Sequence, residues 1–266
     1  YSLLSTGGTS SLTSSEKTAA DVNKDNKIDA NDATLILGMY AYNSTTLTPF
    51  ETMEEYLEHV NNTPKWTEIE PSSSTQNASA SYKLFNKDTI IDTTDLVFKG
   101  TITNLKEYEI EAKGENGEKL GPFTKSIVEV TVDEVYHGEI NKDTIKIYYP
   151  TSLSTHYDGS FILRENQEYI FLTNDISEDI DKKYNVKKYA DTSLSAGLRN
   201  GVMPVIDNVV SVYEEYFNND ESAMSKAIPQ DDVLDKMPEE ARGKWFLTFN
   251  KNDFVELLGG LFKNNA

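Results

Sequence analysis

A short loop near the start of the chain carries oxygen-bearing side chains at fixed intervals. With Asp21 counted as loop position 1, positions 1, 3, 5, 9 and 12 are Asp21, Asn23, Asp25, Asp29 and Asp32. A hard divalent cation such as Ca²⁺ takes about six to eight oxygen ligands, and alternating positions of a tight loop turn such side chains inward. Position 7 contributes only its backbone carbonyl, so Lys27 completes the ligand set. The loop therefore predicts a Ca²⁺ site.

The spacing is that of an EF-hand loop, with two departures from the general pattern. Position 6 is Asn26 rather than glycine, which the loop tolerates because asparagine is enriched at positive φ. Position 12 is Asp32 rather than glutamate, so this ligand is one methylene shorter. Upstream, residues 10–18 are polar and rich in serine and threonine, so we expect no entering helix. The predicted unit is a loop followed by one helix.

The helix predicted after the loop, residues 33–41, is apolar on more than one face. Ile36 and Tyr40 share one stripe and Leu35 and Met39 share another. A surface helix of a larger domain needs only one apolar stripe. We therefore expect this helix to be covered on two sides, by a sister helix and by a protein partner.

Residues 20–37, from Ala20 through the loop to Leu37, resemble the type I dockerin family. The resemblance implies a Ca²⁺-binding module that docks to a cohesin on a scaffoldin. It also implies a secreted, extracellular protein of a Gram-positive bacterium, held in a cellulosome-type complex at the cell surface that degrades plant polysaccharide. The partner contacts that it implies are Ala30, Asn31, Leu37, Gly38 and Tyr42. Since Ala30 and Asn31 differ from the Ser/Thr pair of some dockerins, the cohesin class stays open.

Dockerins carry two such repeats, and only one is complete in this sequence. The first six residues, Tyr1–Thr6, echo residues 40–45, sharing tyrosine and Ser-Thr at the same spacing. We therefore expect the chain to start at the end of a first repeat whose loop is missing.

Composition excludes several classes of function. The chain has no cysteine, so it has no disulfide, thiolate nucleophile or Cys-ligated zinc. Its formal net charge of −19 disfavours nucleic acid and anionic membrane surfaces as partners. No apolar run approaches the length of a membrane span.

The pattern along the chain predicts three regions: a partial dockerin module at 1–46, a helix and Ser-rich linker at 47–81, and a second domain at 82–266. Within the linker region, residues 51–62 have helical spacing, and residues 71–81 are of low complexity.

The second domain is predicted to be a small antiparallel β-barrel with C-terminal helices, which makes the chain an α+β protein. Strands are expected at 95–104, 126–136, 143–149, 168–173 and 202–210, with a hairpin turn at 114–117. The last of these segments is broken by Pro204 and turns at Asp207 and Asn208. Segments such as Val97–Asn104, Val132–Ile140 and Glu165–Leu172 weakly resemble secreted OB-like β-barrel domains of Gram-positive bacteria. Helices are expected at 211–218, at 229–241 and from Asn250 onward. In the last of them, one apolar stripe should pack on the barrel: Phe254, Leu257, Leu258, Leu261 and Phe262. Close packing against the sheet would explain Gly259 and Gly260 in the last of these helices.

No catalytic residue is predicted. The three histidines, His59, His137 and His156, stand in no metal-binding or catalytic motif, and phosphate-binding and nucleophile-elbow motifs are absent. The sequence favours a non-catalytic cargo domain that binds carbohydrate or a protein. Two alternatives remain open. The first is a carbohydrate-active hydrolase, either a glycoside hydrolase or an esterase, with an unrecognised site. The second is an OB-like protease inhibitor.

Overall fold

A computed structural model describes residues 12–46, 48–71, 76–78, 94–113, 118–157, 160–194, 201–217, 220–243 and 245–263. The described chain divides into two compact units, with the boundary between Thr63 and Pro64. The repeat echo at residues 1–6 and the turn at 114–117 lie outside the described residues.

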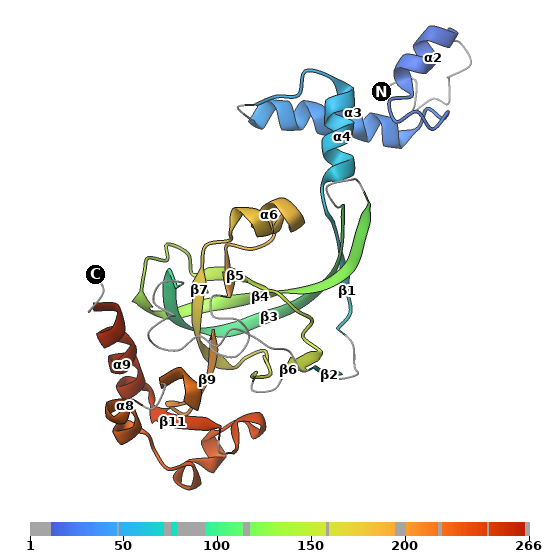
Figure 1. Ribbon diagram of the computed structural model, residues 1–266. Coiled ribbons are helices and arrows are strands. Elements are labelled where there is room, and N and C mark those ends of the chain that lie inside the picture. The colour runs from blue at the N-terminus through green and yellow to red at the C-terminus, as the bar shows by residue number, and fades with distance from the viewer. Residues whose placement is uncertain are drawn as a thin grey trace. The chain divides into compact units, whose positions relative to one another are not determined.

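The described part of the first unit contains three helices, α2 (Ser14–Ala20), α3 (Ala30–Thr45) and α4 (Met53–Asn62) (Figure 1). The expectation that no helix enters the loop was wrong. Thr13 caps α2 in a reciprocal capping box, in which its side chain accepts from Glu16 N and the Glu16 carboxylate accepts from Thr13 N. Two orphan N–H groups are thereby satisfied, so a polar, Ser-rich segment starts a helix without an apolar stripe.

Helix α4, which confirms the helix expected at 51–62, belongs to the first unit because it packs on α3. The Tyr42 ring lies 4.8 Å from that of Phe50 and 5.4 Å from that of His59, measured between ring centroids. The Asn43 side chain forms two hydrogen bonds of 2.9 Å with the main chain of Phe50, donating to its carbonyl and accepting from its N–H. A Cβ added at Gly38 would meet the Tyr56 hydroxyl, so the glycine allows the two helices to approach closely.

The second unit is built on a nine-stranded sheet and a separate two-stranded parallel pair. The sheet runs in the order β1-β3-β4-β5-β8-β7-β9-β10-β11, and β3 also pairs with β7. Its strands are β1 (Lys65–Ile69), β3 (Leu96–Lys113), β4 (Lys119–His137), β5 (Thr144–Tyr149), β7 (Glu168–Asn174), β8 (Thr192–Leu194), β9 (Val202–Ile206), β10 (Val209–Tyr213) and β11 (Phe246–Asn250). The parallel pair is β2 (Gln76–Ala78) with β6 (Thr155–Tyr157).

Five of these strands pair in a ring. β3 pairs with β4, β4 with β5, β5 in parallel with β8, β8 with β7, and β7 again with β3. The predicted mixed α+β class is confirmed. The fifth strand of the ring is the three-residue β8 rather than 202–210. That segment instead forms the β9–β10 hairpin, which turns at Asp207 and Asn208, both at positive φ.

The expected start of the second domain at residue 82 is too late. β1 pairs along its whole length with β3, from Lys65 opposite Glu111 to Ile69 opposite Glu107. Part of the expected linker, residues 76–78, is likewise a strand, paired with β6. A Ser-rich composition suggested a flexible connection, but main-chain pairing with β6 holds residues 76–78.

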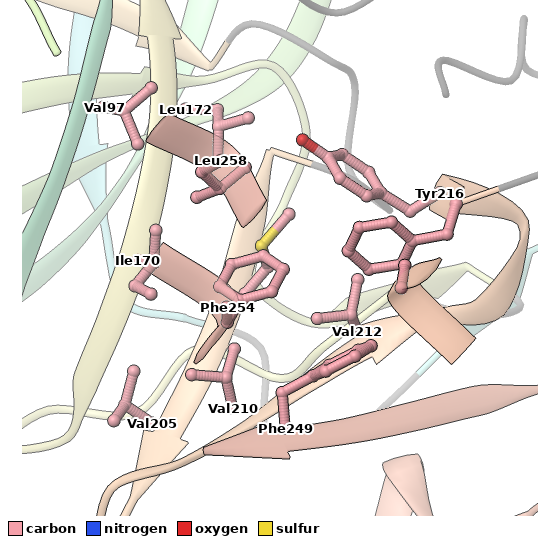
Figure 2. Packing of buried hydrophobic residues seen from close by; sticks show 13 residues of the cluster. Val97, Ile170, Leu172, Val205, Val210, Val212, Tyr216, Phe249, Phe254 and Leu258 are labelled. Atoms are coloured by element: carbon pink, nitrogen blue, oxygen red, sulfur yellow. The ribbon is translucent and has the colours of Figure 1, made fainter. Parts of the chain in front are cut away.

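Most of the first part of β3, residues 97–102, and most of β7 are buried, and two of the hydrophobic clusters of the second unit lie on opposite faces of these strands. Phe98, Ile102 and Phe171 face the interior of the ring, whereas Val97 and Leu172 face the other way, because successive side chains of a strand alternate. Figure 2 shows this second cluster, in which Val97, Ile170 and Leu172 meet residues of β9, β10, β11 and α9 (Lys251–Lys263).

Helix α9 packs on the sheet as predicted, with Phe254 and Leu258 fully buried.

The prediction of the other two C-terminal helices was wrong. Of the segment 211–218, residues 211–213 continue strand β10 and residues 214–217 form a 3₁₀ turn, η4 (Glu214–Phe217). Residues 229–241 form three 3₁₀ turns, η5 (Gln230–Asp232), η6 (Leu234–Lys236) and η7 (Glu239–Ala241). Tertiary contacts hold these short turns, for example the paired hydrogen bonds of 2.9 and 3.1 Å between Arg164 and Glu240. Two helices were not expected, α6 (Glu178–Tyr184) and α8 (Glu221–Lys226).

The explanation expected for Gly259 and Gly260 in α9 was also wrong, because a Cβ added at either glycine meets no atom within 4 Å. Glycine in a helix interior costs about 1 kcal/mol relative to alanine. We therefore expect Gly260→Ala to raise the free energy of unfolding of the second unit by ~1 kcal/mol, measured by urea denaturation. Gly259→Ala is the matched comparison, and a loss of stability in both variants would contradict the open surroundings seen here.

Candidate calcium site and docking face

The predicted Ca²⁺ loop lies between α2 and α3 and folds back on its own carboxylates. Asp21 Oδ1 accepts a hydrogen bond from Asp25 N at 3.1 Å, and Asp21 Oδ2 accepts one from Asn26 N at 2.9 Å. The first ligand position is therefore tied to the middle of the loop. This wrapping brings positions 1, 3 and 5 to the same side.

Asp32 closes the loop from its other end. Its Oδ1 accepts from Val22 N at 2.9 Å and its Oδ2 from Asp29 N at 2.9 Å, and the residue is 1% exposed. Asp29 and Asp32 also form the capping box that starts α3. One carboxylate thus links the beginning of the loop to the beginning of the helix.

The middle of the loop turns through two residues in the left-handed region, Lys24 at φ 61° and Asn26 at φ 66°. The expected tolerance of asparagine at loop position 6 is confirmed by this conformation. Two hydrogen bonds hold this turn: Asp25 N donates to Asn23 Oδ1 at 3.0 Å, and Lys27 N donates to Asp25 Oδ1 at 2.8 Å.

The donor set of this loop fits Ca²⁺. Four carboxylates and one amide oxygen are confined to a loop of twelve positions, and both of its lysines, Lys24 and Lys27, are exposed. Oxygen donors of this kind are the ligands of a hard cation, which would relieve the repulsion among the carboxylates. Within the described residues, no three His, Cys, Asp or Glu side chains converge as a ready metal cluster. The fit therefore rests on the donor set and on the way the loop wraps.

The outer face of α3 is apolar and open to solvent. Ile36, Leu37 and Tyr40 share this face, and Leu37 and Tyr40 are 46% and 76% exposed. Of the predicted partner residues, Ala30, Asn31 and Leu37 are exposed, whereas Gly38 and Tyr42 contact α4. The predicted set of partner residues omits Ile36 and Tyr40, although the apolar stripe that they share is visible in the sequence.

Residues 2–38 match the family model of the dockerin type I domain. This part of the chain is a dockerin type I domain. The match includes the whole Ca²⁺ loop and ends inside α3, so the rest of α3 and all of α4 extend the dockerin unit beyond the matched residues. A dockerin implies Ca²⁺ binding and a cohesin as partner. No curated protein matches the chain.

The three histidines lie in different parts of the fold. His59 is packed between the rings of Tyr42 and Phe50, so it has a structural role. His137 lies at the end of β4 opposite Val97. His156 lies in β6, with its side chain outside the described residues. Among the helices that the structure describes, none is long and apolar enough to cross a membrane.

Proposed function

We propose that the chain docks to a cohesin on a scaffoldin through its dockerin unit and carries the second unit as cargo. The complex is an extracellular, cellulosome-type assembly that degrades plant polysaccharide. The observation that carries this proposal is the double role of Asp32, which is a Ca²⁺ ligand by position and also starts the helix with the open apolar face.

Ca²⁺ would act structurally in this docking. Asp21, Asn23, Asp25, Asp29 and Asp32 would hold the ion with the main-chain carbonyl of Lys27. With its carboxylates neutralised, the loop keeps α3 at a fixed angle, because metal binding and folding of such a loop are coupled. Ile36, Leu37 and Tyr40 then offer an apolar surface of the kind that forms the centre of protein interfaces, with Ala30 and Asn31 at its rim.

For the cargo, we propose an OB-like barrel that acts as a binding module. Five strands that pair in a ring, with one long bent pair, β3 and β4, support this assignment. A hydrolase with an unrecognised site and a protease inhibitor remain the alternatives for this unit.

Calorimetric titration of type I cohesin modules into the full chain tests the docking proposal. We expect binding in Ca²⁺ and none in excess chelator. Leu37→Asp should weaken docking by about 100-fold, because it places a charge at the centre of an apolar contact. Leu234→Asp in the second unit is the matched control, since Leu234 is 41% exposed. Equal affinity with and without Ca²⁺, or an unchanged affinity of Leu37→Asp, would refute the proposal.

A further inference from the structure

A cavity of about 210 Å³ lies in the second unit, outside the ring of strands. Its walls come from β3, β4, β5 and residues 187–191. Ile127 and Glu129 line it, whereas Val128 and Val130, which alternate with them on β4, face the ring interior. The cavity therefore lies on the opposite face of β4 from the ring interior, over a smaller buried cluster that includes Ile127 and Ala190, and all of its lining residues belong to the second unit.

One wall of the cavity is aromatic, and its rings are held in place by Trp66, which does not line the cavity. Tyr108 and Tyr189 line it, and Trp66 on β1 stacks on Tyr189 with ring centroids 4.2 Å apart. Trp66 also meets Tyr108 edge to face at 5.3 Å and donates its indole N–H to the Tyr184 carbonyl at 2.6 Å. Such pre-positioned rings offer a surface to the C–H face of a ligand without a further ordering cost.

The rim of the cavity concentrates positive charge in an acidic protein. Four of its ten lining residues are lysines, whereas the whole chain has 25 Lys and Arg among 266 residues. Lys106 pairs with Glu68 at 3.0 Å, Lys146 with Glu129 at 3.1 Å, and Lys187 with Glu178 at 2.6 Å. These ion pairs are solvent-accessible, so each contributes little to the stability of the fold. Each lysine can therefore exchange its carboxylate partner for a bound anion.

Among the residues that the structure describes, Lys188 is the lining lysine without an ion-pair partner. It pairs with no carboxylate in the described part of the chain, and its ammonium lies 5.7 Å from the centre of the Tyr189 ring. A cation beside an aromatic wall is placed to hold the carboxylate of a ligand whose ring lies on that wall.

The cavity also contains acceptors. Glu129 and Asp191 line it, and Asp191 is held by Lys142 at 2.5 Å and by Lys146 N at 2.8 Å. Fixed carboxylates next to lysines suit a ligand that has hydroxyl donors as well as a negative charge.

We propose that this cavity binds an acidic sugar, with the carboxylate of one uronic acid unit on Lys188, its C–H face on Tyr108 and Tyr189, and its hydroxyls on Glu129 and Asp191. A volume of about 210 Å³ lies below the roughly 300–1,000 Å³ of sites for drug-sized ligands, so one ring of a longer acidic saccharide occupies the cavity.

The test is calorimetric titration of the full chain with a trisaccharide of galacturonic acid, and with the neutral galactose trisaccharide for comparison. We expect binding of the acidic sugar only, with an affinity that falls as salt concentration rises. Because all of the lining residues belong to the second unit, a Ca²⁺ chelator should leave this binding unchanged while it abolishes cohesin docking.

Lys188→Gln should weaken binding of the acidic sugar by about tenfold or more, since a charge-assisted hydrogen bond is lost. Lys182→Gln is the matched control, because Lys182 is an exposed lysine on α6 outside the cavity lining. Equal binding of the neutral sugar, equal binding of acetate alone, an effect of Lys182→Gln as large as that of Lys188→Gln, or no binding at all would each overturn the proposal.

Discussion

Replacing Asp32 by alanine is expected to abolish Ca²⁺ binding and cohesin docking together. The carboxylate is the proposed ligand at loop position 12, and it also accepts hydrogen bonds from Val22 N and Asp29 N. Alanine removes both functions, so the loop loses its ion and α3 loses the Asp32 half of its capping box, while Asp29 still caps Asn31 N. Calorimetric titration of Ca²⁺ into the chelator-stripped variant should show no binding at the concentrations that saturate the unchanged chain.

Two further variants show whether the loss of Ca²⁺ binding comes from the missing negative charge of Asp32 or from a change in the structure of the loop. Asp32→Asn keeps an acceptor for the backbone N–H groups but removes the negative charge, so we expect it to retain helix α3 and still lose most of its Ca²⁺ affinity. Glu58→Ala, on the exposed side of α4, changes charge in the same unit outside the loop and should bind Ca²⁺ normally. Normal Ca²⁺ affinity in Asp32→Ala would show that the ion binds elsewhere.

Gly100→Ala is expected to destabilise the second unit by about 3 kcal/mol or more. Gly100 lies in β3 between two neighbours, opposite Val132 on β4 and Tyr169 on β7. A Cβ at this position would lie 2.5 Å from the carbonyl oxygen of Thr131 and would also meet the Val130 side chain. The carbonyl belongs to a paired strand and cannot move aside, so the ring itself must distort.

Urea denaturation of the second unit measures this effect. Gly260→Ala provides the opposite expectation within the same unit, because a Cβ there meets no atom. Ca²⁺ titration of Gly100→Ala should remain normal, since the dockerin loop belongs to the other unit. A stability within about 0.5 kcal/mol of the unchanged chain would show that β3 and β4 are not packed as closely as seen here.

Features that depend on a few consecutive residues could be predicted from the sequence. The Ca²⁺ loop is one such feature, because its predicted ligands and its turn at Asn26 all lie within twelve positions; Asn26 has the expected positive φ, and the family match covers the loop. The helix at 51–62, the turn at Asp207 and the packing stripe of α9 are others. In each case the period of apolar residues or the conformational preference of a single residue carries the signal.

Features that depend on contacts between distant segments were decided only by the tertiary structure. A three-residue strand, β8, closes the ring because main-chain partners on β5 and β7 are available, although its sequence is too short to show a period. The lysine-rich cavity joins residues about 80 positions apart, such as Lys106 and Lys188. A linear sequence shows neither which strands become neighbours nor which side chains then share a surface, because both are fixed by long-range pairing and burial.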